Sequence, residues 1–208
     1  MLKIMLRIKD VLPLVFRLIK STYYKRKFNH FGWLSIIRSP LKIGGAKNIW
    51  IGDKVIIEYK TWLAAIPKKG GTAELILEDG CTVGHFNHIY ATKSIILHKN
   101  VLTADKVYIS DNLHGYEDIN IPIKNQPVKQ INTVEIGEGS WLGENVCVLG
   151  VKIGKHCIIG ANSVVTQDIP DYCIAVGAPA KVIKRYDFSE QQWKKTDGLK
   201  TVSENLGG

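Results

Sequence analysis

The stretch VYISDNLHGYED, residues 107–118, places a histidine among side chains that can hold or move a proton. The imidazole of His114 has an ordinary pKa near neutrality, which suits a general base that removes a proton from a weak nucleophile. Asp111 and Glu117 lie within three residues of His114, and either carboxylate could orient the ring. The alternative for each carboxylate is a loop cap that bonds nearby backbone. The segment therefore predicts base catalysis at His114 and leaves the orienting carboxylate open.

The part of the chain that must position this histidine has a six-residue repeat. From residue 136 the chain reads IGEGSW, LGENVC, VLGVK, IGKHCI, IGANSV and VTQDIP, and each unit opens on an aliphatic residue. Neither a helix nor a free-standing strand has this period, whereas a coil of short parallel strands does. We expect the aliphatic residue to point into a narrow interior and the small fifth residue to fit a crowded corner. The glycine after the aliphatic residue is expected to tolerate unusual backbone dihedrals.

The same frame extends upstream and defines the expected organisation of the chain. It predicts an all-β solenoid over residues 43–185, with an active-site loop at about 110–133. Residues 1–42 are expected to form a basic amphipathic helix and a lead-in. Residues 186–208 are expected to form a C-terminal helix and tail, because Ser189 and Gln192 have capping-box spacing. Cys81 and Cys157 occupy fifth positions, so we interpret both as corner residues and not as nucleophiles.

The net charge of +9 is concentrated at the N-terminus. Residues 1–30 contain eight Lys or Arg against one acid, so residues 31–208 are nearly neutral. A nucleic-acid partner is therefore not expected, because it would require a basic face on the domain itself. Residues 2–20 can form an amphipathic helix that either packs on the protein or docks residues 1–27 on an anionic membrane. We predict a cytoplasmic protein. If residues 1–27 dock on the membrane, the protein would be peripheral at its inner face.

The run WLGENVCVLGVKIGKHCIIGANSVVTQDIPDYCIAVGAPAKVI, preceded by SDNLHGYEDINIPIKNQP, resembles the hexapeptide-repeat acyltransferases. The resemblance is closest to the O-acetyltransferases of surface-polysaccharide pathways, and the chain is also similar to maltose and galactoside acetyltransferases. Membership would imply a left-handed parallel β-helix, a homotrimer, and acetyl-CoA as co-substrate lying between neighbouring coils. It would also assign His114 as the base that takes the proton of a sugar hydroxyl during direct attack on the thioester.

The resemblance also implies roles for other positions. Asn87 and Tyr116 would contact the sugar or glycan acceptor, and the alternative for Asn87 is a corner amide that bonds its own backbone. Small and polar residues would lie along the pantetheine arm of acetyl-CoA, and a basic residue would pair with a CoA phosphate. These cofactor positions are Trp141, Gly143, Glu144, Ala161, Thr166, Gln167 and Lys181. Gln167 departs from the lysine often found there, which weakens the expected phosphate contact.

Three other function classes remain open at this point. A sugar N-acetyltransferase is the first alternative, although such enzymes on this fold usually carry an additional N-terminal domain and residues 1–42 are too short for one. The H-x-x-H spacing of His85 and His88 raises a metal-dependent hydratase like the carbonic anhydrases of this fold. That class should offer three histidines in another spacing, so no metal is expected. A non-catalytic scaffold would give no reason for the polar loop around His114.

Overall fold

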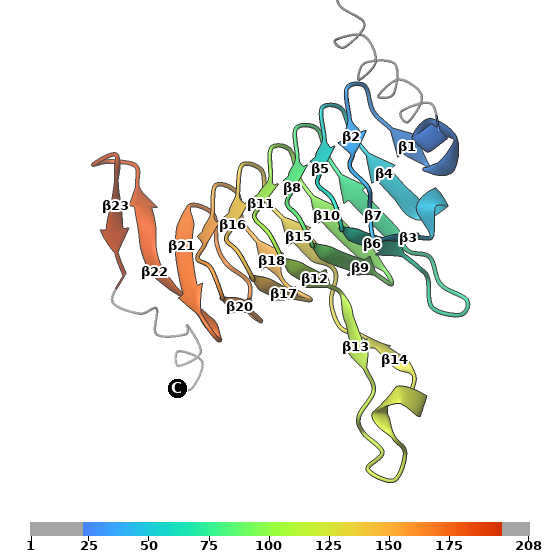
Figure 1. The fold of residues 1–208 in the computed structure, drawn as a ribbon. Helices are drawn as coiled ribbons and strands as arrows, with labels where there is room; N and C mark the ends of the chain where they lie inside the picture. The colour runs from blue at the N-terminus through green and yellow to red at the C-terminus, as the bar shows by residue number, and fades with distance from the viewer. Residues whose placement is uncertain (1–22, 197–208) are drawn as a thin grey trace, which may run out of the picture.

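The computed structural model describes residues 23–196, and nearly all of them lie in or between short β-strands. Three sheets form the sides of a coil, and their strands are parallel except at the C-terminal end of sheet B (Figure 1). Sheet A contains β1 (His30–Phe31), β4 (Ile49–Ile51), β7 (Glu74–Leu77), β10 (Ser94–Leu97), β15 (Val134–Ile136) and β18 (Lys152–Ile153). Sheet B contains β2 (Ile36–Ile37), β5 (Ile56–Ile57), β8 (Thr82–Val83), β11 (Leu102–Thr103), β16 (Trp141–Leu142), β19 (Ile158–Ile159), β21 (Cys173–Gly177), β22 (Ala180–Asp187) and β23 (Gln192–Lys195). Sheet C contains β3 (Lys42–Gly44), β6 (Trp62–Ala65), β9 (His88–Ala91), β12 (Tyr108–Ser110), β17 (Cys147–Leu149) and β20 (Val164–Val165).

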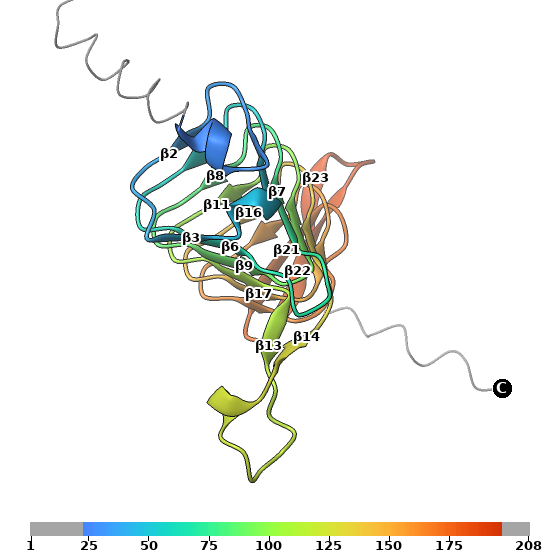
Figure 2. The ribbon, with the colours of Figure 1, turned by 90° about the vertical axis from the view of Figure 1, so that its right-hand side faces the viewer.

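The chain passes through sheets A, B and C in turn, so each set of three strands is one coil (Figure 2). The first coil, β1 to β3, begins upstream of the boundary at residue 43 that the repeat suggested, and its last strand crosses that boundary. A short 3₁₀ turn, η1 (Ala46–Asn48), leads into the second coil. The solenoid therefore starts at residue 30, before the hexapeptide pattern becomes visible in the sequence.

The leading aliphatic residues fill the interior, as the six-residue period predicts. On sheet C, for example, Leu63, Ile89, Ile109 and Val148 are in register on consecutive strands and have no exposed surface. The fifth-position residues are buried at the corners. Cys81 and Cys157 confirm the corner interpretation, since burial raises the pKa of the first thiol to about 12 and of the second to about 11.

The explanation expected for the glycines is wrong. Gly137 and Gly154 do not adopt the left-handed conformation. A Cβ on Gly137 would instead lie 2.4 Å from the backbone carbon of Gly154 in the next coil, so close approach of the coils excludes a side chain. Left-handed dihedrals occur two residues later in each corner, mostly at non-glycine residues such as Lys106 and Asn145.

The long insertion after β12 is an ordered arm. It forms an antiparallel ribbon of β13 (Asn112–His114) and β14 (Val128–Gln130), followed outward by a turn with the 3₁₀ segment η2 (Ile123–Asn125). The arm projects from the edge between sheets C and A (Figures 1 and 2). His114 is therefore fixed on a strand, opposite Val128.

The predicted C-terminal helix around residues 189–193 is wrong, because this segment forms the turn and the second strand of an antiparallel hairpin. Asp187 accepts hydrogen bonds from the backbone N–H and hydroxyl of Ser189 and from the N–H of Glu190. The hydroxyl that would cap a helix is thereby used in the turn. The rings of Tyr186 and Trp193, opposite each other on β22 and β23, pack edge to face at 5.4 Å and fix the hairpin.

The expected N-terminal amphipathic helix over residues 2–20 and its membrane contact lie outside the described residues. Within the described part, residues 23–27 are helical and Tyr24 packs on Phe28 and Phe31 above the first coil. No helix among the described residues has the length and apolar character needed to cross a membrane.

Candidate functional site

The structure places His114 on the exposed face of the arm, without a side-chain hydrogen bond to any other described residue. Neither predicted carboxylate reaches it within the subunit. Glu117 accepts hydrogen bonds from the Lys129 ammonium and from the N–H of Tyr116. The Lys129 contact holds the pKa of the Glu117 carboxyl below its ordinary value. Tyr116 is exposed, and the Lys129 ammonium lies 5.8 Å from the centre of its ring.

Asp111 lies at the root of the arm and is fully buried. Its carboxylate accepts backbone N–H groups of Thr92, Lys93 and Ser94 at 2.7–2.9 Å, and the side-chain amide of Asn112 at 3.0 Å. These contacts match the alternative that the sequence left open for Asp111, a carboxylate that caps a loop by bonding its backbone. Asp111 holds the arm onto the turn of the preceding coil, so any effect on His114 is through the position of the arm.

Asn87 is likewise occupied within the fold. Its amide nitrogen lies 2.8–3.0 Å from the carbonyls of Gly84 and Ala104 and from the Thr103 hydroxyl, and its oxygen accepts the N–H of Val107 at 2.5 Å. The residue is 1% exposed. This geometry matches the alternative of a corner amide, in which both polar atoms of Asn87 are bonded within the fold.

The predicted cofactor residues fall into two groups. Gly143, Glu144 and Ala161 lie at consecutive corners of the edge between sheets B and C, which we call the B–C edge. The hydrogen bond from the N–H of Gly177 to the Ser163 hydroxyl brings the turn before Lys181 to the end of the same edge. Trp141 lies beside this group, outward on sheet B and 45% exposed.

The second group is separate. Thr166 and Gln167 follow β20 at the edge between sheets C and A, which is also the edge that carries the arm two strands earlier in sheet C. One subunit therefore divides the predicted residues between two edges of the coil. Bringing His114 to the B–C edge would require a second copy of the chain.

His85 and His88 do not converge. The His88 ring is stacked on Trp62 at 4.1 Å on the outer face of sheet C, and burial lowers the pKa of its imidazole. The His85 ring lies at the B–C edge beside Asp105 and Glu58. In the described range, no group of three or more His, Cys, Asp and Glu side chains is placed to hold a metal ion.

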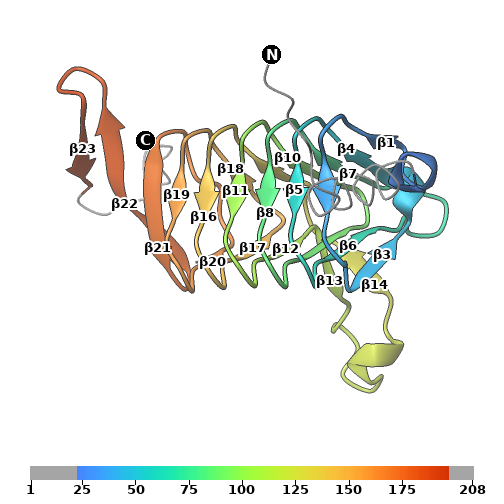
Figure 3. The ribbon, with the colours of Figure 1, turned by 45° about the horizontal axis from the view of Figure 1, so that its top comes forward.

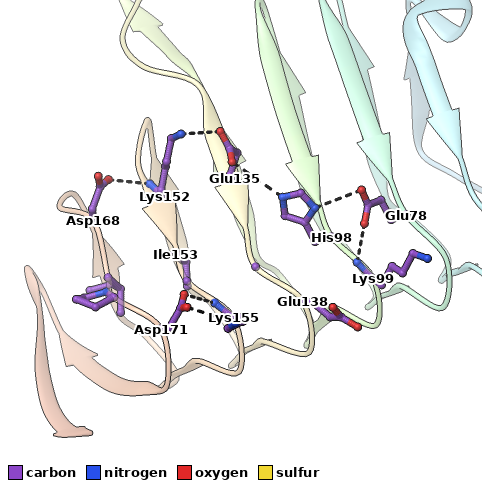
Figure 4. Close-up of a pocket in the computed structure, with 14 residues that line it drawn as sticks. Glu78, His98, Lys99, Glu135, Glu138, Lys152, Ile153, Lys155, Asp168 and Asp171 are labelled. Carbon is purple, nitrogen blue, oxygen red and sulfur yellow. Dashed lines mark hydrogen bonds and ion pairs between the residues drawn. The ribbon is translucent and has the colours of Figure 1, made fainter.

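The structure also contains a groove of about 760 Å³ that sequence reasoning did not find. It lies on the outer face of sheet A (Figure 4). Its charged walls are joined between coils by contacts such as His98 to Glu78 at 3.2 Å and Lys152 to Glu135 at 2.8 Å. None of the predicted site residues lines it. The signal in the sequence that could have found this groove is the alternation of acidic and basic residues at outward positions of sheet A. This pattern indicates ion pairing between neighbouring coils.

Comparison with known proteins identifies the class. A family model described as the hexapeptide repeat of succinyl-transferase matches residues 133–167. The protein named as lipopolysaccharide biosynthesis O-acetyl transferase WbbJ of Escherichia coli (strain K12) is 32% identical over 186 residues, which cover 86% of this chain and 92% of that protein. The protein named as acetyltransferase Rv3034c of Mycobacterium tuberculosis is 44% identical over 112 residues, which cover 53% of this chain and 37% of that protein.

Solved structures share the coil. AntD, an N-acyltransferase from Bacillus cereus in complex with dTDP and 3-hydroxybutyryl-CoA, superposes with a TM-score of 0.67 at 18% identity, over 82% of this chain and 90% of that one. The hexapeptide-repeat acetyltransferase VCA0836 from Vibrio cholerae, complexed with acetyl coenzyme A, gives 0.55 at 22% identity, over 82% and 78%. At these identities the likeness concerns the fold alone.

The repeat, the three-sided coil and the similarity to WbbJ over most of both chains define a hexapeptide-repeat protein of the acyltransferase class. This chain belongs to the hexapeptide-repeat acyltransferase family and is an enzyme of that family. Membership implies the left-handed coil expected from the sequence resemblance.

Proposed function

We propose that this enzyme is an acetyl-CoA-dependent O-acetyltransferase that acts on a sugar hydroxyl in surface polysaccharide biosynthesis. The observation that carries the proposal is the placement of His114, an exposed imidazole on an ordered arm whose root is fixed by a buried carboxylate. The name of the E. coli relative supports a hydroxyl acceptor. The alternative is sugar N-acetylation, which the naming of AntD as an N-acyltransferase favours.

In the proposed reaction, His114 removes the hydroxyl proton while the sugar oxygen attacks the thioester carbonyl. The bond from the carbonyl carbon to sulfur then breaks, and the departing CoA sulfur receives the proton from the imidazolium. No acyl-enzyme is formed, and an ordinary imidazole can serve both steps near neutral pH. Glu117 and Tyr116 remain candidates for contacts made once the acceptor is bound.

We further propose a homotrimer in which each site lies between two subunits. Support comes from the division of the predicted residues between two edges. It also comes from sheet B, whose strands β5, β8, β16, β19 and β21 lie side by side in Figure 3, because its outer face carries an apolar stripe that no other described element covers. The stripe consists of in-register outward residues that are neither acidic nor basic: Ile36, Ile56, Thr82, Leu102, Trp141, Ile158 and Ile174. A continuous apolar face of this kind is typical of an interface.

The test is turnover of acetyl-CoA with a panel of sugar and glycan acceptors. Release of the CoA thiol measures the rate, and mass spectrometry identifies the acetylated product. His114→Asn should lower kcat by about 10²–10⁴, the usual contribution of a positioned general base, at unchanged affinity for acetyl-CoA. His156→Asn is the matched control, because His156 is also exposed but lies at a corner between sheets A and B. Equal loss in both variants, or turnover within a few-fold of wild type in His114→Asn, would contradict the proposal.

A further inference from the structure

Phe86 is an exception among the corner residues of the B–C edge. It adopts the left-handed conformation with φ of 57° and is 50% exposed. The corresponding corner residues of neighbouring coils are Lys60, Lys106, Asn145 and Asn162. Asparagine tolerates this conformation better than a bulky aromatic residue, and an exposed ring gains little from burial. The corner therefore carries a conformational cost while half of the Phe86 surface stays exposed.

A second exposed ring lies beside it on the preceding coil. Tyr59 is 44% exposed, and its ring centre lies 5.5 Å from that of Phe86 at an angle of 73°. It also packs edge to face on the His85 imidazole at 4.2 Å. Three rings thus gather at one exposed point of the edge.

The His85 ring is held in place from two sides. Its Nδ1 lies 3.0 Å from Asp105 Oδ1, which also accepts the backbone N–H of His85 at 2.8 Å, and its Nε2 lies 3.5 Å from Glu58 Oε2. Partial burial acts to raise the pKa of the Asp105 carboxyl, but the two bonds from His85 outweigh it and hold that pKa below its ordinary value. Arg38 pairs with the same oxygen of Glu58 at 3.2 Å.

The second oxygen of each carboxylate remains available. Among residues 23–196, no hydrogen bond or ion pair involves Glu58 Oε1 or Asp105 Oδ2. Asp105 is exposed enough to meet a ligand, with 45% of its side chain accessible. Two carboxylate oxygens in fixed positions therefore flank the three rings.

This cluster is continuous with the predicted cofactor edge. Lys106, the residue after Asp105, forms a 2.7 Å ion pair with Glu144 at the next corner. Gly143 and Ala161 follow along the same edge. A molecule bound at Phe86 would thus lie two to three coils from the path predicted for the pantetheine arm.

We propose that Tyr59, His85 and Phe86 form the binding platform for the acceptor sugar, with Glu58 and Asp105 accepting hydrogen bonds from its hydroxyls; this inference rests on the proposed function. A pyranose ring has an apolar C–H face and a rim of hydroxyls, which matches exposed aromatic rings flanked by acceptor oxygens. The platform takes the acceptor role that Asn87 cannot take with its buried, fully bonded amide.

A second subunit is a less suitable occupant. The centres of protein interfaces are depleted of charged residues, and this cluster contains two carboxylates and an arginine around the rings. The apolar stripe of sheet B offers a much better face for another copy.

The experiment replaces Phe86 with the residue that neighbouring corners use. Phe86→Asn removes the ring and suits the left-handed backbone, so the fold should be retained. With the acceptor identified in the screen above, we expect the acceptor KM to rise on the order of tenfold or more, a loss typical of an apolar specificity contact. The KM for acetyl-CoA and the trimer mass should be unchanged. Tyr59→Ala should raise the acceptor KM in the same direction.

The matched control is Tyr172→Asn. Tyr172 is also an aromatic corner residue with positive φ, at 56°, but it lies at an edge between sheets A and B. We expect its acceptor KM to equal that of the wild type. An unchanged acceptor KM in both Phe86→Asn and Tyr59→Ala, or dissociation of the trimer in Phe86→Asn, would overturn the platform while leaving the proposed function intact. Absence of wild-type turnover with every sugar acceptor would overturn both.

Discussion

At the residue scale, Asp111 shows how a carboxylate near the proposed catalytic histidine, His114, can act through structure. It is fully buried and accepts the N–H groups of three successive residues, Thr92 to Ser94. Hydrogen bonds to a charged acceptor contribute more than neutral ones, and their loss leaves buried donors unpaired. The residue therefore fixes the start of the arm to the coil before it.

Asp111→Ala should lower the free energy of unfolding by about 3 kcal/mol or more, because the buried N–H of Thr92 and the partly buried N–H groups of Lys93 and Ser94 lose a charged acceptor. Urea unfolding of the variant and the wild type measures the difference. Glu117→Ala is the control, since Glu117 is exposed and its loss should change stability by less than about 1 kcal/mol. A stable Asp111→Ala protein that has lost turnover would instead indicate a direct contact with His114 in the assembled site.

At the element scale, the corner is the repeating unit that determines the coil. Its two backbone requirements fall on different residues: the position after the leading aliphatic residue needs space, and the position two residues later needs a positive φ. Glycine meets the first requirement because it has no Cβ. Asparagine, lysine and histidine meet the second at most corners, where their polar side chains reach solvent.

Gly137→Ala should destabilise the protein by about 1–3 kcal/mol, as expected when an added methyl group is forced against fixed backbone. The new Cβ would lie 2.4 Å from the backbone of the next coil. Gly71→Ala is the matched substitution, because its Cβ would meet only the Lys68 carbonyl at 3.4 Å in an exposed loop. Thermal unfolding compares the two, and equal midpoints would contradict the close-approach explanation.

At the scale of the whole molecule, the sheet B stripe and the divided site make the same demand for a second copy. Leu102 lies in the middle of the stripe and is 43% exposed, so a lysine there should be tolerated in a single subunit. Charge in an apolar interface without a partner opposes association.

Leu102→Lys should therefore convert the proposed trimer to a lower mass at working concentration while the circular dichroism spectrum is unchanged. Light scattering measures the mass, and turnover should fall with it if each site lies between two subunits, as we propose. Ile66→Lys is the control, an equally exposed aliphatic residue outside the stripe. A trimer that survives Leu102→Lys would place the interface on another face.

The sequence by itself determined the coil. Each repeat carries its own inward aliphatic residue, so the six-residue period is visible without knowledge of contacts between distant residues. It also identified His114 as the candidate base, since a single imidazole in a polar insertion is visible without coordinates. The resemblance added the family, which the similarity to WbbJ then established.

Only the tertiary structure decided which residues share an edge. Asp111 and Asn87 have the composition of site residues, but their partners come from neighbouring coils 16 to 20 residues away, and those contacts bury them. The same stacking of coils gathers Tyr59, His85, Phe86 and Asp105 from three corners that no sequence motif connects. The C-terminal hairpin likewise depended on pairing between β22 and β23, which a local helix-capping signal could not anticipate. Local period therefore specified the coil, whereas contacts between coils determined which side chains are free to act.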